Sequence, residues 1–385
     1  MGTGHAPSPL AHLMTDPITL AGEIASSTAA SHAPEVDSAS RYPAETLDAI
    51  RSSGLLGLIS SPEVGGQGRG HAEAAGVVER IARECGSSAM ITCMHYAATV
   101  VIEQCGDEAT RRAIAEGRHL TTLAFSEAGS RSHFWAPLGT ATPEGDQVRL
   151  DARKSWVTAA RQVDSYVWSS KPTAGEAPST LWLVPRETAG LECQGEFDAI
   201  GLRGNGSVPV HADGARIPAS NRLGEDGAGM DLMLGTVLPM FNLCISAVNL
   251  GLMEGAVQKT IEHVSGKRYE HLGTSLAELP TIRAYVARMR IATDQARLLV
   301  EDTGAALAAG RPDAVLRVLE SKAAVGETTT QVLDLAMRVC GGMAFRKEVG
   351  VERRFRDGRA GTVMAPTTDQ LYDFIGKALC GLDLF

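Results

Sequence analysis

Apolar residues recur at helical spacing near both ends of the chain, whereas its middle part carries short, clustered apolar runs. Positions three and four apart are apolar from Ile18 through Ile24, and the same period returns after Pro43, which is the pattern of helices that pack on a core. Residues 1–15 are expected to form a flexible lead-in. The other helices predicted for this first part lie at 71–83, 87–105 and 107–116.

Between Thr121 and Pro218 the pattern changes to β-branched or aromatic runs separated by turn residues. Several short strands with no long helical window between them predict an all-β domain of about 100 residues, built either as two packed sheets or as a flattened barrel. The predicted strands lie at 122–126, 147–150, 164–170, 180–185 and 208–211.

From Gly229 the helical period returns, in segments long enough to pack as a bundle. We therefore expect an α+β chain with an N-terminal helical domain (1–120), a middle β domain (121–228) and a C-terminal four-helix bundle (229–385). The predicted helices of the last domain lie at 232–264, 279–309, 314–342 and 368–379.

Composition narrows the classes of function and the compartment. The chain has 36 Lys and Arg against 45 Asp and Glu, a net charge of −9, which argues against nucleic-acid and anionic-membrane binding. Its seven cysteines are scattered without metal-type spacing, as in a reducing compartment. No signal-peptide pattern and no run of about 18 apolar residues is present, so a cytoplasmic protein without a membrane span or a metal site is expected.

A glycine pair and a basic run near the C-terminus carry the first candidate chemistry. Gly341-Gly342 lets another backbone or a flat ligand come close, because neither residue has a Cβ. The arginines that follow, between Arg346 and Arg359, could hold phosphate through bidentate contacts. Taken alone, the stretch is better interpreted as a helix-loop-helix with a solvated charged face.

This stretch resembles the C-terminal signature of the acyl-CoA dehydrogenase family, in which a Q-x-x-G-G-x-G-F cofactor loop precedes R-D and E-G-T. The glutamate that takes the α-proton of the acyl thioester in that family aligns with Ala365, and the second position, used by a minority, aligns with Phe241. Neither position holds a carboxylate. The residues in register with the signature are Gly341, Gly342, Phe345, Arg356, Asp357 and Thr367.

Two motifs of the middle domain extend the resemblance. Residues 124–130 are similar to the family's T-E-x-G-x-G-S-D turn, and residues 154–160 are similar to its K-x-W-I-T-N segment. The resemblance implies FAD as cofactor, with the Ser126 hydroxyl along the flavin, Trp156 behind the ring and Thr158 donating to its N5 edge. Alone, a strand Trp is usually core and a turn Ser a local cap, but the ordered pair favours the cofactor site.

The missing glutamate leaves the catalytic base open. Asp369 lies four residues after Ala365, one helical turn on, and could reach a similar volume. The competing interpretation is a carboxylate that only stabilises a helix N-terminus, and it weighs more. Weaker candidates are Glu127, Asp231, His95 and Tyr372. Loss of a general base costs a factor of about 10² to 10⁴ in rate.

Adjacent aromatic residues after the first flavin motif suggest a substrate pocket. His133 and Phe134 could line it, with an imidazole that titrates near neutrality and a flat apolar surface, while Ala365 opens space over the ring. A buried loop anchor is the equal alternative for the His133-Phe134 pair.

Three functions remain open. The first is a FAD-dependent oxidoreductase that dehydrogenates an acyl thioester, on CoA or on a carrier protein, with a flavoprotein as possible electron acceptor. The second is a flavin-dependent oxidase or monooxygenase of a non-thioester substrate on the same fold. The third is a non-catalytic flavin- or acyl-binding homologue. The resemblance also implies a homodimer or homotetramer in which the Gly341-Gly342 loop contacts the partner's FAD.

Overall fold

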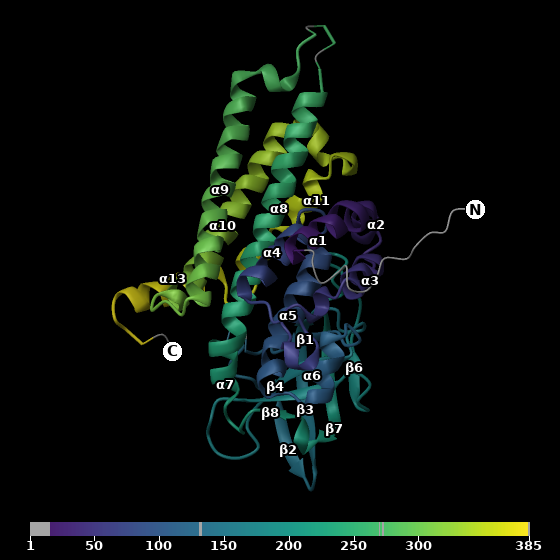
Figure 1. Cartoon of the computed structure of the whole chain (residues 1–385), viewed down its shortest axis with the longest axis vertical. Coiled ribbons are helices and arrows are strands. Elements are labelled where there is room, and N and C mark those ends of the chain that lie inside the picture. Colours follow the sequence, from purple (N-terminus) through teal and green to yellow (C-terminus); the bar gives the residue numbers. More distant parts are fainter. Residues whose placement is uncertain (1–15, 131–132, 269, 272, 384–385) are drawn as a thin grey trace, which may run out of the picture.

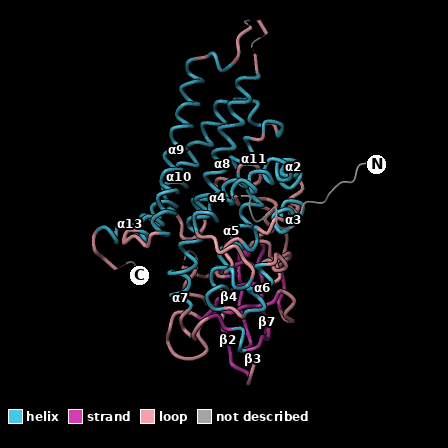
Figure 2. The backbone as a smooth tube through the Cα atoms, in the orientation of Figure 1, coloured by secondary structure: helices cyan, strands magenta, loops and turns pink. Residues whose placement is uncertain are grey.

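The computed structural model describes residues 16–130, 133–268, 270–271 and 273–383. Long helices form one end of the elongated molecule and the strands gather at the other, with the N-terminal helices between them (Figures 1 and 2). The predicted α+β class and the order helical, β, helical are confirmed. The predicted lead-in at 1–15 lies outside the described residues.

The N-terminal helices build a layer around α5, whose residues are buried along most of its length. The side chain of Asp16 begins α1 by accepting a hydrogen bond from the Thr19 N–H at 2.9 Å, with Pro17 in the first turn. A π-helical segment, Ala25–Ala29, joins α1 to α2. The helices are α1 (Pro17–Ile24), α2 (Ala30–Ser38), α3 (Ala44–Ser52), α4 (His71–Ala82), α5 (Gly86–Cys105) and α6 (Glu108–Ala115).

The middle part forms two four-stranded sheets with the strand orders β1-β4-β5-β8 and β2-β3-β7-β6. All six residues of β4 are buried, whereas exposure broadly alternates along β3 and β7. The antiparallel β3–β7 pairing is irregular between Lys154 and Val157. The strands are β1 (Thr121–Ala124), β2 (Thr140–Glu144), β3 (Gln147–Val157), β4 (Ser165–Ser170), β5 (Thr180–Pro185), β6 (Leu191–Cys193), β7 (Val208–Pro218) and β8 (Arg222–Leu223).

Three long helices dominate the C-terminal part, and α8 packs against α4, α9 and α10. The predicted helix 232–264 is divided, because a π-helical segment at Met233–Val237 separates α7 from α8. The helices are α7 (Gly229–Leu232), α8 (Leu238–Gly266), α9 (Pro280–Ala308), α10 (Ala314–Cys340), α11 (Val351–Asp357), α12 (Ala360–Val363) and α13 (Thr368–Leu379).

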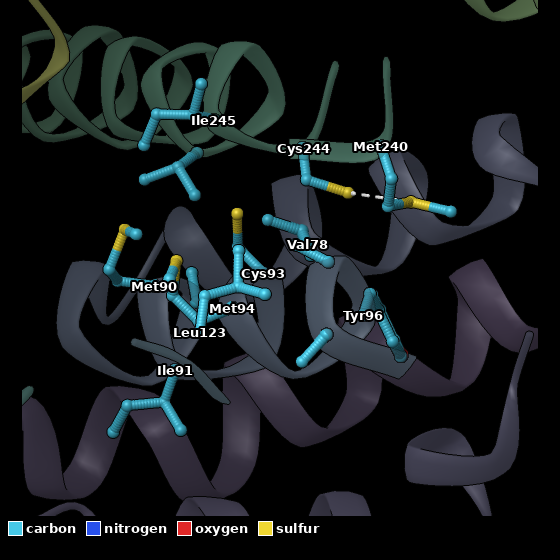
Figure 3. Packing of buried hydrophobic residues seen from close by; sticks show 14 of the residues in the cluster. Val78, Met90, Ile91, Cys93, Met94, Tyr96, Leu123, Met240, Cys244 and Ile245 are labelled. Atoms are coloured by element: carbon cyan, nitrogen blue, oxygen red, sulfur yellow. Dashed lines mark hydrogen bonds between the residues drawn. The ribbon is translucent and has the colours of Figure 1, made fainter. Parts of the chain in front are cut away.

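The core continues from the N-terminal layer into this bundle. Met90, Cys93 and Met94 of α5 lie below Cys244 and Met240 of α8 in Figure 3, and all five are buried. Among the described residues, the one stretch long and apolar enough to cross a membrane is Gly229–Gly266, and 72% of its most apolar window is buried inside the molecule, as in a core helix.

Candidate functional site

A cavity of about 910 Å³ lies where α5, the turn after β1, the end of β3, the start of α8 and the segment 356–365 meet. It brings together five of the predicted site residues, which come from three separate parts of the chain. These residues are Ser126, Phe134, Trp156, Thr158 and Ala365. Phe241, at the second position of the family glutamate, also lines it.

Trp156 presents an open aromatic face at the irregular end of β3. Its φ of 58° is uncommon for a bulky residue, and its side chain is 70% exposed. The two flavin-type motifs are tied together here, since the Ser155 N–H donates to the carbonyl of Ser126 at 2.8 Å. The hydroxyl of Thr158 lies 3.0 Å from that of Ser207. An exposed indole on a cavity wall offers a flat surface to a ring-shaped ligand.

Glu127 lines the same cavity, but its carboxylate is fully engaged. It forms a buried ion pair with Lys154 at 2.6 Å and accepts hydrogen bonds from the N–H groups of Leu138 and Gly139. Lys154 also donates to both oxygens of Ser169, and burial lowers its pKa to about 8 against the opposing charge of Glu127. A carboxylate held in this way fixes the turn before β3 and is not free to take a proton.

No free, buried carboxylate lines the cavity among the described residues. Besides Glu127 the lining includes one further acid, Asp198, whose side chain is 95% exposed and lies 3.7 Å from Arg203. The two positions of the family glutamate are filled by the apolar side chains of Phe241 and Ala365. The acid that the sequence lacks is therefore not supplied from elsewhere in the lining.

The structure leaves five predicted site residues outside this cavity. Asp369 is exposed in the first turn of α13, and the Thr367 hydroxyl accepts from the Gln370 N–H at 3.4 Å as the cap of that helix. Gly341 and Gly342 are exposed directly after α10. His133 is exposed and lies edge-on to Trp135, with ring centroids 5.1 Å apart.

The basic run after Gly342 is largely neutralised within the chain. Arg346, Lys347, Arg354 and Arg356 pair with acidic side chains, the last with both Asp37 and Glu352. Arg356 and Arg359 both line the cavity, and Arg353 donates to the main-chain carbonyl of Glu84. Arg359 has no ion pair among the described residues, and its guanidinium carbon lies 4.2 Å from the centre of the Phe355 ring. A phosphate contact by this run stays a prediction, and Arg359 is the arginine of the cavity lining without an acidic partner.

Sequence reasoning missed the apolar end of the cavity. Met90 and Met94 of α5, Leu123 of β1 and Val237 before α8 line it. Their spacing is that of ordinary core positions, so the pattern of the chain gave no signal that they border a cavity.

Comparison with known proteins identifies the family. The model of the acyl-CoA dehydrogenase N-terminal domain matches residues 19–117, and that of the C-terminal domain matches residues 227–380. Human mitochondrial short-chain specific acyl-CoA dehydrogenase is 28% identical over 344 residues, which cover 88% of this chain and 82% of the human protein. The chain therefore belongs to the acyl-CoA dehydrogenase family.

Solved structures agree on the fold. Butyryl-CoA dehydrogenase from Megasphaera elsdenii superposes with a TM-score of 0.89 at 21% identity, covering 98% of this chain and all of that one. A structure of PigA with FAD and proline gives a TM-score of 0.86 at 20% identity, covering 98% and 99%. As a member of the acyl-CoA dehydrogenase family, the chain is a flavoenzyme whose cofactor is FAD.

The cavity fits this cofactor at the flavin end. Trp156 offers the flat apolar face, and the Ser126 hydroxyl has no partner among the described residues, so it remains available as a donor. Ser126, Trp156 and Thr158 are the residues of this acyl-CoA dehydrogenase family member that would hold the ring. When bound, FAD supplies the acceptor for the two electrons of the oxidation.

Proposed function

We propose that this flavoenzyme dehydrogenates an acyl thioester, and that the backbone of position 365, without a carboxylate side chain, takes part in binding the thioester. The carbonyl of Met364 accepts a hydrogen bond from the Lys322 ammonium at 2.9 Å. In the trans peptide that joins Met364 to Ala365, the N–H lies on the opposite side from that carbonyl.

This N–H supports the thioester assignment. Met364 and Ala365 line the cavity and Lys322 does not, so the side away from Lys322 is the cavity side. Among the described residues, the Ala365 N–H has no acceptor. A donor aimed into a partly apolar cavity can hold a carbonyl oxygen and stabilise the negative charge that develops on it when the α-proton leaves.

The apolar end of the cavity suits an acyl chain. Met90, Met94 and Leu123 line the cavity together with the segment that carries Ala365. Thioether side chains are flexible and fill irregular space, so they adapt to an acyl group without fixing its shape. Phe241 closes this end where the second glutamate position of the family lies.

The proposal is tested by adding a panel of acyl-CoAs to the purified flavoprotein under anaerobic conditions while the yellow flavin band is followed. We expect slow bleaching with the wild-type chain. The Ala365→Glu variant restores a carboxylate on the cavity wall and should bleach faster by a factor of about 10² to 10⁴.

Phe241→Glu is the matched comparison, because it introduces a carboxylate at the second position that the family uses for its glutamate. An Asp369→Asn variant tests the candidate base that the sequence suggested. We expect its flavin to bleach at the wild-type rate, because Asp369 is exposed outside the cavity. Absence of bleaching in the wild-type and both glutamate variants would refute thioester dehydrogenation.

A second candidate is supported by the same missing carboxylate. A flavin-dependent oxidase or monooxygenase of a non-thioester substrate needs no glutamate at position 365, and the small Ala365 side chain leaves room in the cavity. Oxygen consumption with a nitroalkane, or with externally reduced flavin, in a protein that no thioester bleaches would place this function first.

Association and electron transfer complete the proposal. Gly341 and Gly342 are exposed and the neighbouring Phe345 is 85% exposed, which supports a surface that a second subunit covers. We propose a homodimer or homotetramer that passes electrons to an acceptor flavoprotein in the cytoplasm.

A further inference from the structure

Two lysines are fully buried in the described part of the chain, and they differ in what surrounds the ammonium group. Lys154 pairs with the carboxylate of Glu127 at 2.6 Å. The Lys322 Nζ donates only to the main-chain carbonyls of Met364 and Pro366, at 2.9 and 2.5 Å. No ion pair within the described ranges involves Lys322.

The charged and titratable groups on the neighbouring elements are engaged elsewhere or exposed. Asp357 of α11, which packs against α10, is buried but accepts a hydrogen bond from the Leu202 N–H at 2.6 Å. Among the described residues, no carboxylate therefore pairs with the Lys322 ammonium. Glu327 of α10 faces the Tyr372 hydroxyl of α13, Glu254 of α8 is bound by Arg290 and Arg297 of α9, Asp369 is exposed, and Arg359 stacks on Phe355.

A buried ammonium without a carboxylate is costly, because the interior solvates charge poorly. Burial accordingly lowers the pKa of Lys322 to about 7. Two carbonyl acceptors offset part of this cost, and an anion on the far side of the 364–366 segment would offset more. That far side is the cavity, since Met364 and Ala365 line it.

We propose that Lys322 is a positioning residue that fixes the 364–366 segment and stabilises negative charge bound in the cavity. It acts in two ways: its hydrogen bond to the Met364 carbonyl orients the Ala365 N–H, and its charge acts across a thin wall of low dielectric. The part of this proposal that concerns a substrate anion rests on the proposed function. Reduced flavin is an anion that the cavity would hold whichever substrate is oxidised.

The test measures the midpoint potential of bound FAD between pH 6 and pH 9. The variants are Lys322→Met, which removes charge and hydrogen bonds, and Lys322→Gln, which keeps a donor without charge. Ser321→Ala is the control, because Ser321 is the buried neighbour on α10 and its hydroxyl has no partner among the described side chains.

We expect a lower potential in both Lys322 variants at pH 6, because reduced flavin loses a nearby cation. The difference from wild type should shrink toward pH 9 as Lys322 loses its proton, and Ser321→Ala should follow the wild type throughout. A difference independent of pH would reduce Lys322 to a structural role and overturn the proposal. Wild-type potentials in Lys322→Gln would equally overturn it, and this variant decides the matter if Lys322→Met does not fold.

Pivaloyl-CoA separates this inference from the proposed function. This thioester has no α-hydrogen, so it can bind without being dehydrogenated. A wild-type protein whose flavin spectrum does not respond to it would contradict thioester binding, while the potentials would still decide the role of Lys322. Weaker binding of pivaloyl-CoA to Lys322→Met than to Ser321→Ala is the expected result.

Discussion

At position 365 only backbone groups can form hydrogen bonds, because the alanine side chain neither accepts nor donates a proton. The free N–H of Ala365 and the carbonyl of Met364 belong to one peptide unit, so whatever fixes that unit fixes the donor. Lys322 is the side chain that does so from the buried side. A residue without contact to the cavity thus determines the direction of a group that lines it.

The lowered pKa of Lys322 also predicts how the free energy of unfolding depends on pH. Its pKa is about 7 in the folded chain and 10.5 in its ordinary environment, so the unfolded chain binds more protons between these values. The free energy of unfolding should therefore rise with pH across this window, by at most about 1.4 kcal/mol per pH unit from this group. Denaturant unfolding of wild type and Lys322→Met at pH 7, 8, 9 and 10 measures the difference in slope.

Other groups titrate in or near the same window, so the comparison of the two proteins is what isolates Lys322. Burial also lowers the pKa of Lys154 to about 8, and this contribution is common to both. Parallel stability curves for wild type and Lys322→Met would contradict the buried ammonium.

Ser126 and Trp156, predicted from two separate motifs, line one cavity, and a backbone hydrogen bond from Ser155 to Ser126 joins the two motifs. That these side chains hold FAD stays a prediction. The proposal for Asp369 used helical spacing from Ala365, but Pro366 intervenes and α13 begins only at Thr368. One helical turn does not separate those residues, so the spacing rule does not apply to them.

At the scale of elements, close packing between α4 and α8 depends on two glycines. A Cβ added at Gly251 would lie 2.3 Å from the carbonyl oxygen of Glu79, and one added at Gly255 would lie 2.3 Å from that of Arg83. Both obstacles are backbone atoms of α4 or its end, which cannot rotate away. The two helices therefore approach at a distance that only glycine permits.

Gly251→Ala should therefore destabilise the chain by about 1–3 kcal/mol through overpacking, although alanine is the better helix former. Gly266→Ala is the control in the same helix, because nothing lies within 4 Å of its added Cβ. We expect the control to be neutral or slightly stabilising. Thermal unfolding of the two variants side by side measures the effect, and equal melting temperatures would contradict it.

The helices α9 and α10 and the strand β4 were predicted within two residues of their observed bounds. The two longest strands were cut short, because the predictions 147–150 and 208–211 correspond to β3 (Gln147–Val157) and β7 (Val208–Pro218). The pattern gave α13 and β5 at their observed bounds, since each shows a clear period or a compact apolar run. The strands β2, β6 and β8 were missed because they are brief and partly exposed, so tertiary pairing more than local sequence defines them.

At the scale of the whole molecule, apolar exposure after α10 indicates an incomplete surface. Phe345 is 85% exposed beside the Gly341-Gly342 pair, although the neighbouring Ala344 is fully buried in the core. A large aromatic residue gains about 1.5–3 kcal/mol when it is buried. Covering this region with a second subunit would recover that energy.

Phe345→Asp should therefore shift the protein toward smaller assemblies without changing the stability of the chain itself. Sedimentation velocity over a range of concentrations measures this shift. Leu138→Asp is the control, because Leu138 is 53% exposed near the β sheets, outside the helical bundle. An unchanged assembly in Phe345→Asp would exclude this residue from the interface.

The exposed indole on the cavity wall has an optical consequence. Three of the four tryptophans are at most 9% exposed, whereas Trp156 is 70% exposed on the wall of the cavity in which we expect FAD to bind. Its emission should stand apart at long wavelength in the cofactor-free protein, be quenched by iodide, and disappear as the isoalloxazine covers it. The fluorescence of Trp156 should therefore report the fraction of the protein that has bound FAD.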